Sequence, residues 1–171
     1  MRRSFQWGAN RIWIAPFLMF FFAAIGIADA FYDSYSIYTG QMLWCPPPID
    51  GCNTVANSPY ARIFGIPLGN LGVIFYLYMF ALAALLLVDP FSHGLRLGAL
   101  IYTALGVSGS IYFMYIQLAY IHAFCIYCLV SAVLTLLLVL TAIRHFRVTK
   151  KMSSASIVNG CKTVEQCLSV S

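Results

Sequence analysis

The sequence predicts an all-α integral membrane protein in which four transmembrane helices form a bundle, capped at one end by an extracytoplasmic loop with a short interfacial helix. Of its 171 residues, 61% are apolar and only 9% are charged, against about 25% charged residues in soluble domains. Four stretches without Asp, Glu, Lys or Arg contain 17, 23, 25 and 21 residues, at 12–28, 66–88, 97–121 and 123–143. A bilayer core about 30 Å thick needs about 20 helical residues. This composition excludes a soluble enzyme, a disordered chain and a nucleic-acid-binding module.

The basic residues indicate the topology, because Lys and Arg collect on the cytoplasmic side of short loops. With four spans, nine of the ten Lys and Arg residues fall on one side, and only Arg62 falls on the other. The opposite side receives the acidic residues of the first loop, Asp29, Asp33 and Asp50. We expect a cytoplasmic N-terminus at 1–11, a membrane domain at 12–145, an outer loop at about 29–65 and a cytoplasmic tail at 146–171. The first stretch is interpreted as a retained helix rather than a cleaved signal peptide.

Prolines and caps predict where the elements begin and end. Pro67 suits the first turn of the second span, and Pro90 ends that span because its ring cannot continue a helix. Ser58, followed by a proline, predicts a capped short helix at 59–64 on the membrane surface. The third and fourth spans meet near His122 with almost no loop, so they should form a tight antiparallel pair that turns on the outer side.

Four of the six cysteines fall on the outer side in this topology. Cys45 and Cys52 lie in the outer loop with six residues between them, and Cys125 and Cys128 begin the fourth span. Positions i and i+3 share a helix face, so the second pair can meet. A helix N-terminus stabilises a thiolate, which favours Cys125 as a nucleophile. The two pairs together indicate thiol-disulfide exchange at the membrane boundary.

Other readings of the cysteines stay open at this point. The second pair is also compatible with two small buried residues, and Cys45 and Cys52 with a structural disulfide of the loop. The spacing also fits a zinc site of four cysteines, although we expect no metal. Cys161 and Cys167 lie in the cytoplasmic tail, where thiols stay reduced, and they receive no role.

The sequence resembles the vitamin K epoxide reductase family of membrane thiol oxidoreductases. The resemblance covers roughly residues 11–145 and rests on Cys45, on the run CNTVANSPYARIFGIPLGNLGVIFY at 52–76, and on Cys-Ile-Tyr-Cys at 125–128. It implies a relay in which a reduced thioredoxin-like protein of the periplasm or lumen attacks the disulfide of Cys45 and Cys52. Cys52 then attacks Cys125, and Cys128 delivers the electrons to a quinone, ubiquinone or menaquinone. In contrast to some bacterial relatives, we expect no thioredoxin-like domain after the last span.

A quinone site should be aromatic with a few hydrogen-bond donors. From their position beside the cysteine pair, Phe124 and Tyr127 are the candidates for its wall. The resemblance implies a second role for Ser58 near the ring. Asn70 is a further candidate, although the family spacing puts Leu68 at the position of the asparagine that contacts quinone in the animal enzymes.

The sequence therefore predicts a quinone-dependent thiol-disulfide oxidoreductase that supports disulfide formation. We expect it in the bacterial inner membrane, with the endoplasmic reticulum membrane as the alternative. One rival is a non-catalytic scaffold or a subunit that binds a redox partner, with structural disulfides. A second rival is a transporter, which needs ionisable residues within the membrane, and the predicted spans contain no charged residue.

Overall fold

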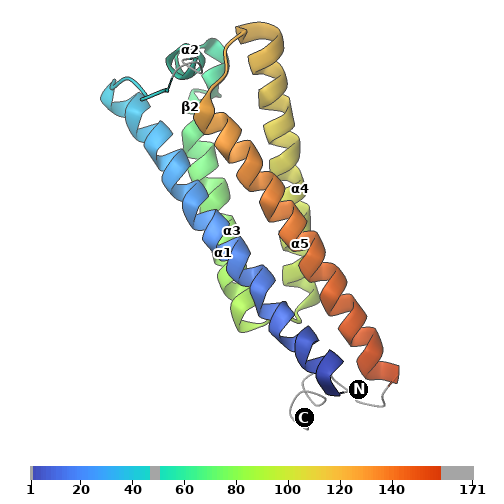
Figure 1. Ribbon diagram of the computed structural model, residues 1–171. Coiled ribbons are helices and arrows are strands. Elements are labelled where there is room, and N and C mark those ends of the chain that lie inside the picture. Colours follow the sequence, from blue (N-terminus) through green and yellow to red (C-terminus); the bar gives the residue numbers. More distant parts are fainter. Residues whose placement is uncertain (1, 47–50, 159–171) are drawn as a thin grey trace.

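Four long helices form an upright bundle in the computed structural model, which describes residues 2–46 and 51–158 (Figure 1). Their bounds are α1 Arg2–Thr39, α3 Leu68–Val88, α4 His93–Ile116 and α5 Ile126–Val158, and a π-helical turn, Gln117–Ile121, continues α4. Each contains an apolar segment long enough to cross a membrane, Ile12–Thr39, Leu68–Val88, His93–Ile121 and Ile126–Met152. The chain is thus a multi-pass membrane protein with the expected four-helix bundle.

The first helix is longer than the sequence predicts. It continues to Thr39 and ends where Gly40 takes a positive φ of 65°, a conformation that glycine adopts without strain. Asp29 and Asp33 therefore lie inside α1, and the expectation of an outer loop at 29–65 is wrong at its start. The prediction ended the first span at residue 28 because an aspartate follows. This boundary is wrong because both aspartates line an interior cavity and do not face lipid. The first span thus does contain ionisable residues.

The last helix is also longer than expected. It runs to Val158, well beyond the expected start of the tail at residue 146. Lys and Arg are good helix formers, so the basic residues after the apolar segment continue the helix. Cys161 and Cys167 lie outside the described residues.

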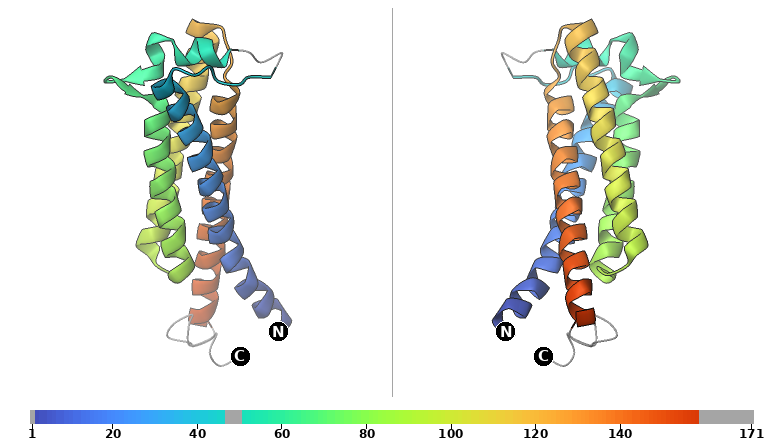
Figure 2. Two further views of the ribbon diagram at one scale, coloured as in Figure 1. Left: turned by 90° about the vertical axis from the view of Figure 1, so that its left-hand side faces the viewer. Right: turned by 90° about the vertical axis from the view of Figure 1, so that its right-hand side faces the viewer.

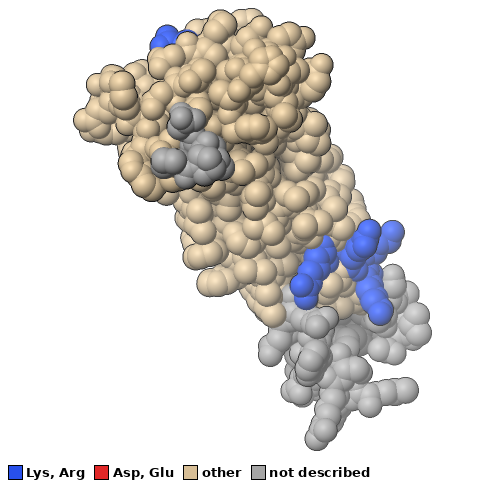
Figure 3. All heavy atoms as spheres, turned by 45° about the horizontal axis from the view of Figure 1, so that its top comes forward, with Lys and Arg blue, Asp and Glu red and all other residues tan. Residues whose placement is uncertain are grey.

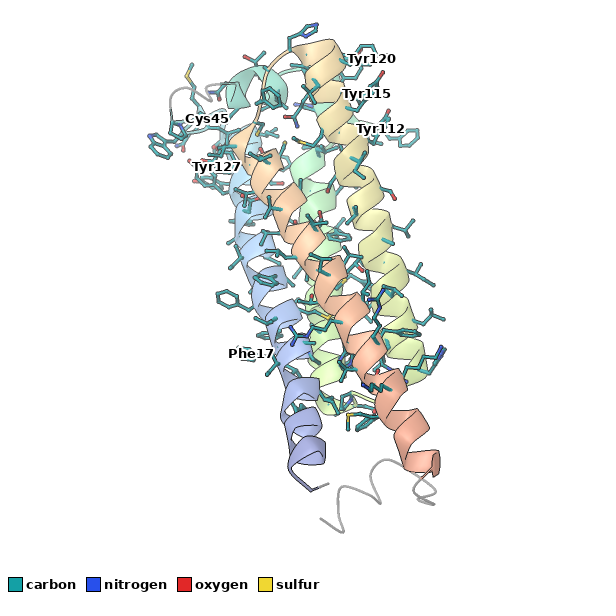
Figure 4. All side chains as sticks on the ribbon, turned by 45° about the vertical axis from the view of Figure 1, so that its right-hand side comes forward. Phe17, Cys45, Tyr112, Tyr115, Tyr120 and Tyr127 are labelled. Atoms are coloured by element: carbon teal, nitrogen blue, oxygen red, sulfur yellow. A yellow bond between two sulfur atoms is a disulfide. The ribbon has the colours of Figure 1, made fainter. Side chains whose placement is uncertain are left out.

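Helix α1 packs against both α3 and α5, and α4 packs against α5. The centre of the bundle consists of buried residues from several helices, among them Met19, Ala23, Tyr76, Met79, Ala83, Leu86 and Leu138. The Tyr76 hydroxyl donates to the Ser131 carbonyl oxygen at 3.0 Å, which links α3 to α5. Large apolar side chains remain exposed on the outer surface, such as Phe17 with 60% exposure, which points away from the bundle (Figure 4). In a membrane this surface contacts lipid.

Short elements cover the end of the bundle opposite to the start of α1 and the end of α5 (Figure 2). They are α2 Cys52–Ala56, a 3-10 turn Pro59–Ala61, and an antiparallel hairpin of β1 Arg62–Ile63 and β2 Ile66–Pro67. The predicted helix at 59–64 is thus only a single turn. Phe64 and Gly65 both have positive φ, 51° and 81°, as the two-residue turn of a hairpin requires, and a helix cannot continue through them.

Ser58 does not cap that turn through its side chain. Its hydroxyl instead donates to the Val55 carbonyl oxygen at 2.7 Å and so closes the C-terminal end of α2. The connection between the third and fourth spans is short, as expected: His122 adopts a left-handed conformation, with φ of 54°, and α5 begins four residues later. The short elements and this turn lie at the same end of the bundle.

Candidate active site

The first cysteine pair forms a disulfide in the loop that covers the bundle. Cys45 and Cys52 are bonded, with their Cα atoms 6.3 Å apart. Cys52 is fully buried at the first residue of α2, whereas Cys45 is partly exposed. Two hydrogen bonds hold the loop segment around Leu43 against α2. The Leu43 N–H donates to Asn53 Oδ1 at 2.9 Å, and Asn53 Nδ2 donates to the Leu43 carbonyl at 3.2 Å. The accessible sulfur is therefore that of Cys45.

The second pair consists of two free thiols at the start of α5. The Cys125 carbonyl accepts the N–H of Leu129 at 3.1 Å, so Cys125 occupies the N-cap position and Cys128 lies in the first turn. A hydrogen bond with the Cys128 thiol lowers the pKa of Cys125, and the backbone N–H groups of Cys128 and Tyr127 act in the same direction. The sequence predicted a thiolate stabilised by the N-terminus of α5, and the hydrogen bond with the Cys128 thiol is the largest cause of the lowered pKa.

The fold brings the two pairs together. Cys52 and Cys125 pack in one buried cluster with Leu43 and Val55. Cys52, Cys125 and Cys128 also line a common small cavity of about 40 Å³, here called the sulfur cavity. The loop carrying one pair thus lies directly against the start of the helix carrying the other.

Gly51 permits this close approach. A Cβ atom at this position would lie 2.7 Å from the Phe124 carbonyl oxygen and 2.9 Å from the Ala123 Cβ. The backbone of Gly51 has an ordinary φ of −75°, so the requirement for glycine is one of space and not of conformation. Any larger residue here would push α2, and with it Cys52, away from Cys125.

A larger cavity of about 200 Å³ lies below the cysteines, within the helix bundle, and is here called the bundle cavity. Cys128 lines it as well as the sulfur cavity. Its wall is mostly apolar and aromatic, with Leu68, Phe75, Tyr76 and Phe113, and contains a few polar side chains: Asp29, Asp33, Ser110, Gln117, Ser131 and Thr135. Such a wall fits the flat apolar ring and polar oxygens of a quinone headgroup.

Of the other expected site residues, Tyr127 and Ser58 each line a cavity and Phe124 does not. Tyr127 lines the bundle cavity, but its hydroxyl donates to the Trp44 carbonyl at 2.7 Å, which ties α5 to the loop (Figure 4). Ser58 lines the sulfur cavity. Phe124 is 47% exposed and is not among the lining residues of either cavity.

Asn70 also lies away from both cavities. Its side chain accepts a hydrogen bond from the Ser34 hydroxyl and donates to the Tyr38 hydroxyl at 2.8 Å. These contacts connect α3 to α1 and give Asn70 a structural role. Leu68, which the family spacing puts at the asparagine position, lines both cavities, whereas Asn70 lines neither.

Sequence reasoning missed Gln117. Its side chain is only 3% exposed and lines both cavities. Gln117 Oε1 accepts the backbone N–H of Cys125 at 3.1 Å, and Gln117 and Cys128 line the same two cavities. The sequence did contain a signal for this residue, because Gln117 is an amide in a mostly apolar stretch, eight residues before Cys125. Gln117 thus fixes the start of α5 at Cys125 and lies beside Cys128.

A sequence model of the vitamin K epoxide reductase family matches residues 17–143. The chain belongs to the vitamin K epoxide reductase family. It is also 33% identical over 125 residues to thiol-disulfide oxidoreductase LTO1 of Arabidopsis thaliana. The match covers 70% of this chain and 33% of the relative, so the chain spans about a third of that protein's length.

Membership of the vitamin K epoxide reductase family fits the cysteine arrangement. The bond between Cys45 and Cys52 removes two of the four thiolates that a zinc site of four cysteines needs. The zinc reading therefore does not fit the state that the structure describes, whereas a bonded pair beside two free thiols suits a thiol-disulfide oxidoreductase.

Proposed function

We propose that this member of the vitamin K epoxide reductase family is a quinone-dependent thiol-disulfide oxidoreductase. The observation that carries the proposal is the common position of Cys52, Cys125 and Cys128 around the sulfur cavity, with Cys128 also on the wall of the bundle cavity. The four cysteines thus form a series that begins at the partly exposed Cys45 and ends at Cys128, which lines a cavity within the membrane bundle. The name of the Arabidopsis relative is consistent with the same class of activity.

Each step of the relay is a displacement of one sulfur by a thiolate. A dithiol partner attacks Cys45 and releases Cys52 as a thiolate, and the second thiol of the partner resolves the mixed disulfide. Cys52 then attacks Cys125 in the oxidised second pair and releases Cys128. Attack of Cys45 on Cys52 restores the loop disulfide and leaves Cys125 and Cys128 reduced.

The reduced second pair then returns to a disulfide, and the quinone accepts its two electrons and two protons. The state in the structure, with the loop pair bonded and the second pair free, corresponds to the stage before this step. We place the quinone headgroup, of ubiquinone or menaquinone, in the bundle cavity, where Leu68, Phe113 and Tyr127 would bound it and Cys128 would face it. Ser58 lines only the sulfur cavity and would act on the cysteines instead.

We propose a thioredoxin-like dithiol protein as the partner, because Cys45 lies at the outer edge of the loop (Figure 4). Beside it Trp44 and Met42 are 71% and 86% exposed and offer an apolar contact surface. Most of the Lys and Arg surface visible in Figure 3 lies at the opposite end of the bundle, and a small basic area is visible at the loop end. This distribution supports cytoplasmic termini and a loop in the periplasm, with the bacterial inner membrane as the location.

Thiol trapping of the purified full-length protein without oxygen tests this function. We expect ubiquinone or menaquinone to oxidise the reduced Cys125 and Cys128, and a reduced thioredoxin-like protein to re-reduce them through the loop pair. Cys128→Ala should abolish quinone reduction but still allow exchange between the partner and Cys45. If Cys128→Ala supports unchanged disulfide formation in cells, the scaffold reading is correct.

A further inference from the structure

Two aspartates of α1 lie inside the membrane bundle next to the cysteines. Asp29 and Asp33 are one helical turn apart, so they share a face of α1, and both line the bundle cavity. Asp33 lines the sulfur cavity as well. The remaining described aspartate, Asp89, lies at the other end of α3, where its carboxylate accepts the N–H groups of Phe91 and Ser92. Asp33 is thus the one described carboxyl group that borders both cavities.

The surroundings leave these carboxyl groups available. Within residues 12–46 and 51–152, neither Asp29 nor Asp33 has a hydrogen bond or an ion pair. Gly69 of α3 makes room for Asp33, because a Cβ atom at Gly69 would lie 2.7 Å from Asp33 Oδ2. Ionisable residues in a membrane interior are costly, and they mark the routes of ions or protons.

We propose that Asp33 carries protons between the cysteine thiols and the electron acceptor, and that Asp29 extends this route along the bundle cavity. The inference rests on the proposed function. Oxidation of Cys125 and Cys128 forms one S–S bond and releases two electrons and two protons, and reduction of a quinone to a quinol consumes both. For each proton in turn, the Asp33 carboxyl group gives its proton to a quinone oxygen, and the resulting carboxylate takes a proton from a thiol.

A purely electrostatic role of Asp33 makes the opposite prediction. The pKa of Cys125 is lowered by its hydrogen bond with Cys128, while burial and the charge of Asp33 act in the other direction. Removing that charge therefore increases the thiolate fraction of Cys125 at a given pH. If charge were the whole effect, Asp33→Asn would speed the oxidation of the pair; if Asp33 carries protons, the same variant slows it.

The test uses the full-length protein in lipid vesicles, reduced with a dithiol and mixed with a short-chain ubiquinone or menaquinone in the absence of oxygen. We expect Asp33→Asn to slow oxidation of Cys125 and Cys128 by about 100-fold, the size of a general acid-base contribution, and Asp33→Glu to recover most of the rate. Asp89→Asn is the matched control, because it removes the same charge far from the cavities, and it should react as the wild type does.

A second measurement needs no quinone. The ultraviolet absorbance of the thiolate, titrated in the reduced protein, should move to lower pH in Asp33→Asn, which shows that the carboxyl group faces Cys125. Oxidation of the wild type should also slow in heavy water, and this isotope effect should shrink in Asp29→Asn.

The outcomes separate the two proposals. A wild type that neither quinone oxidises overturns the proposed function, and this inference with it. A wild type that is oxidised, together with an Asp33→Asn variant that reacts at the same rate or faster, overturns the proton route and leaves the proposed function in place. An unshifted thiolate titration also contradicts the position of Asp33 on which the route depends.

Discussion

Cys52 at the start of α2 and Cys125 at the start of α5 pack side by side in one buried cluster. One belongs to the bonded loop pair and the other to the free pair. The loop is held in this position by the paired hydrogen bonds between Leu43 and Asn53 and by the hydrogen bond from Tyr127 to Trp44. If the proposed exchange between the pairs occurs, the packing of Cys52 and Cys125 in one cluster means that it should need no rearrangement of the long helices.

The first prediction follows from this contact. Replacing Cys45 and Cys128 together by Ser leaves Cys52 and Cys125 as the only cysteines of the two pairs, and these should form a disulfide under mild oxidation. Peptide mapping by mass spectrometry without reduction detects the bond. The matched control replaces Cys52 and Cys128 and leaves Cys45 with Cys125. If both double variants cross-link equally, Cys52 has no special access to Cys125.

Gly51→Ala tests the close approach of the loop. The added Cβ atom meets the backbone of Phe124, so α2 must move and exchange between Cys52 and Cys125 should slow by about 10-fold or more, the equivalent of about 1.4 kcal/mol. Gly94→Ala is the control: a Cβ atom there meets nothing within 4 Å, and alanine favours a helix by up to about 1 kcal/mol. The rate of exchange, followed by rapid acid quenching and thiol trapping, should be unchanged in this control.

Gln117→Leu removes the amide that accepts the backbone N–H of Cys125. Leucine fills a similar volume but leaves the Cys125 N–H without its acceptor, and an unsatisfied buried donor costs about 1–3 kcal/mol. We expect a loss of unfolding free energy in this range, together with slower oxidation of the pair. Gln117→Glu retains the acceptor for Cys125 and should preserve more of the stability. Equal denaturation curves for Gln117→Leu and the wild type would falsify the assigned role.

The pH dependence of Cys125 follows from its lowered pKa. An ordinary cysteine has a pKa of about 8.5, so Cys125 should remain partly a thiolate at pH values where free cysteine is protonated. Its reactivity is therefore expected to persist to lower pH and to disappear only on further acidification. Cys128→Ala removes the hydrogen bond that contributes most, and the titration of Cys125 should then move to higher pH. Thiolate absorbance measures both curves, and a shift to lower pH contradicts the assignment.

Tyr76→Phe tests the link between α3 and α5. The Tyr76 side chain is 1% exposed, and its hydroxyl lies 2.8 Å from Ser131 Oγ in addition to its bond with the Ser131 carbonyl. Loss of these hydrogen bonds should lower the unfolding free energy by about 1 kcal/mol. Tyr112→Phe removes the same group from a side chain that is 59% exposed and points away from the bundle (Figure 4). Thermal unfolding in detergent should distinguish the two variants.

The sequence by itself determined the membrane fold and the family. Four apolar stretches separated by prolines and charges predict four helices, because a bilayer core requires a minimum length of apolar helix. The short turn at His122 was also predictable, since almost no chain separates the two spans. The cysteine spacing identified the four sulfur atoms that the fold then brings to one end of the bundle.

Only the tertiary structure decided which polar groups surround those sulfur atoms. Hydropathy ended the first span at residue 28, because a charge is normally excluded from lipid, whereas Asp29 and Asp33 continue α1 and face an interior cavity. Gln117 and Leu68 line both cavities beside the cysteines, and Asn70 and Phe124 line neither. Helix packing determines which side chains face a cavity, and contacts between distant segments fix that packing, so local sequence patterns do not specify it.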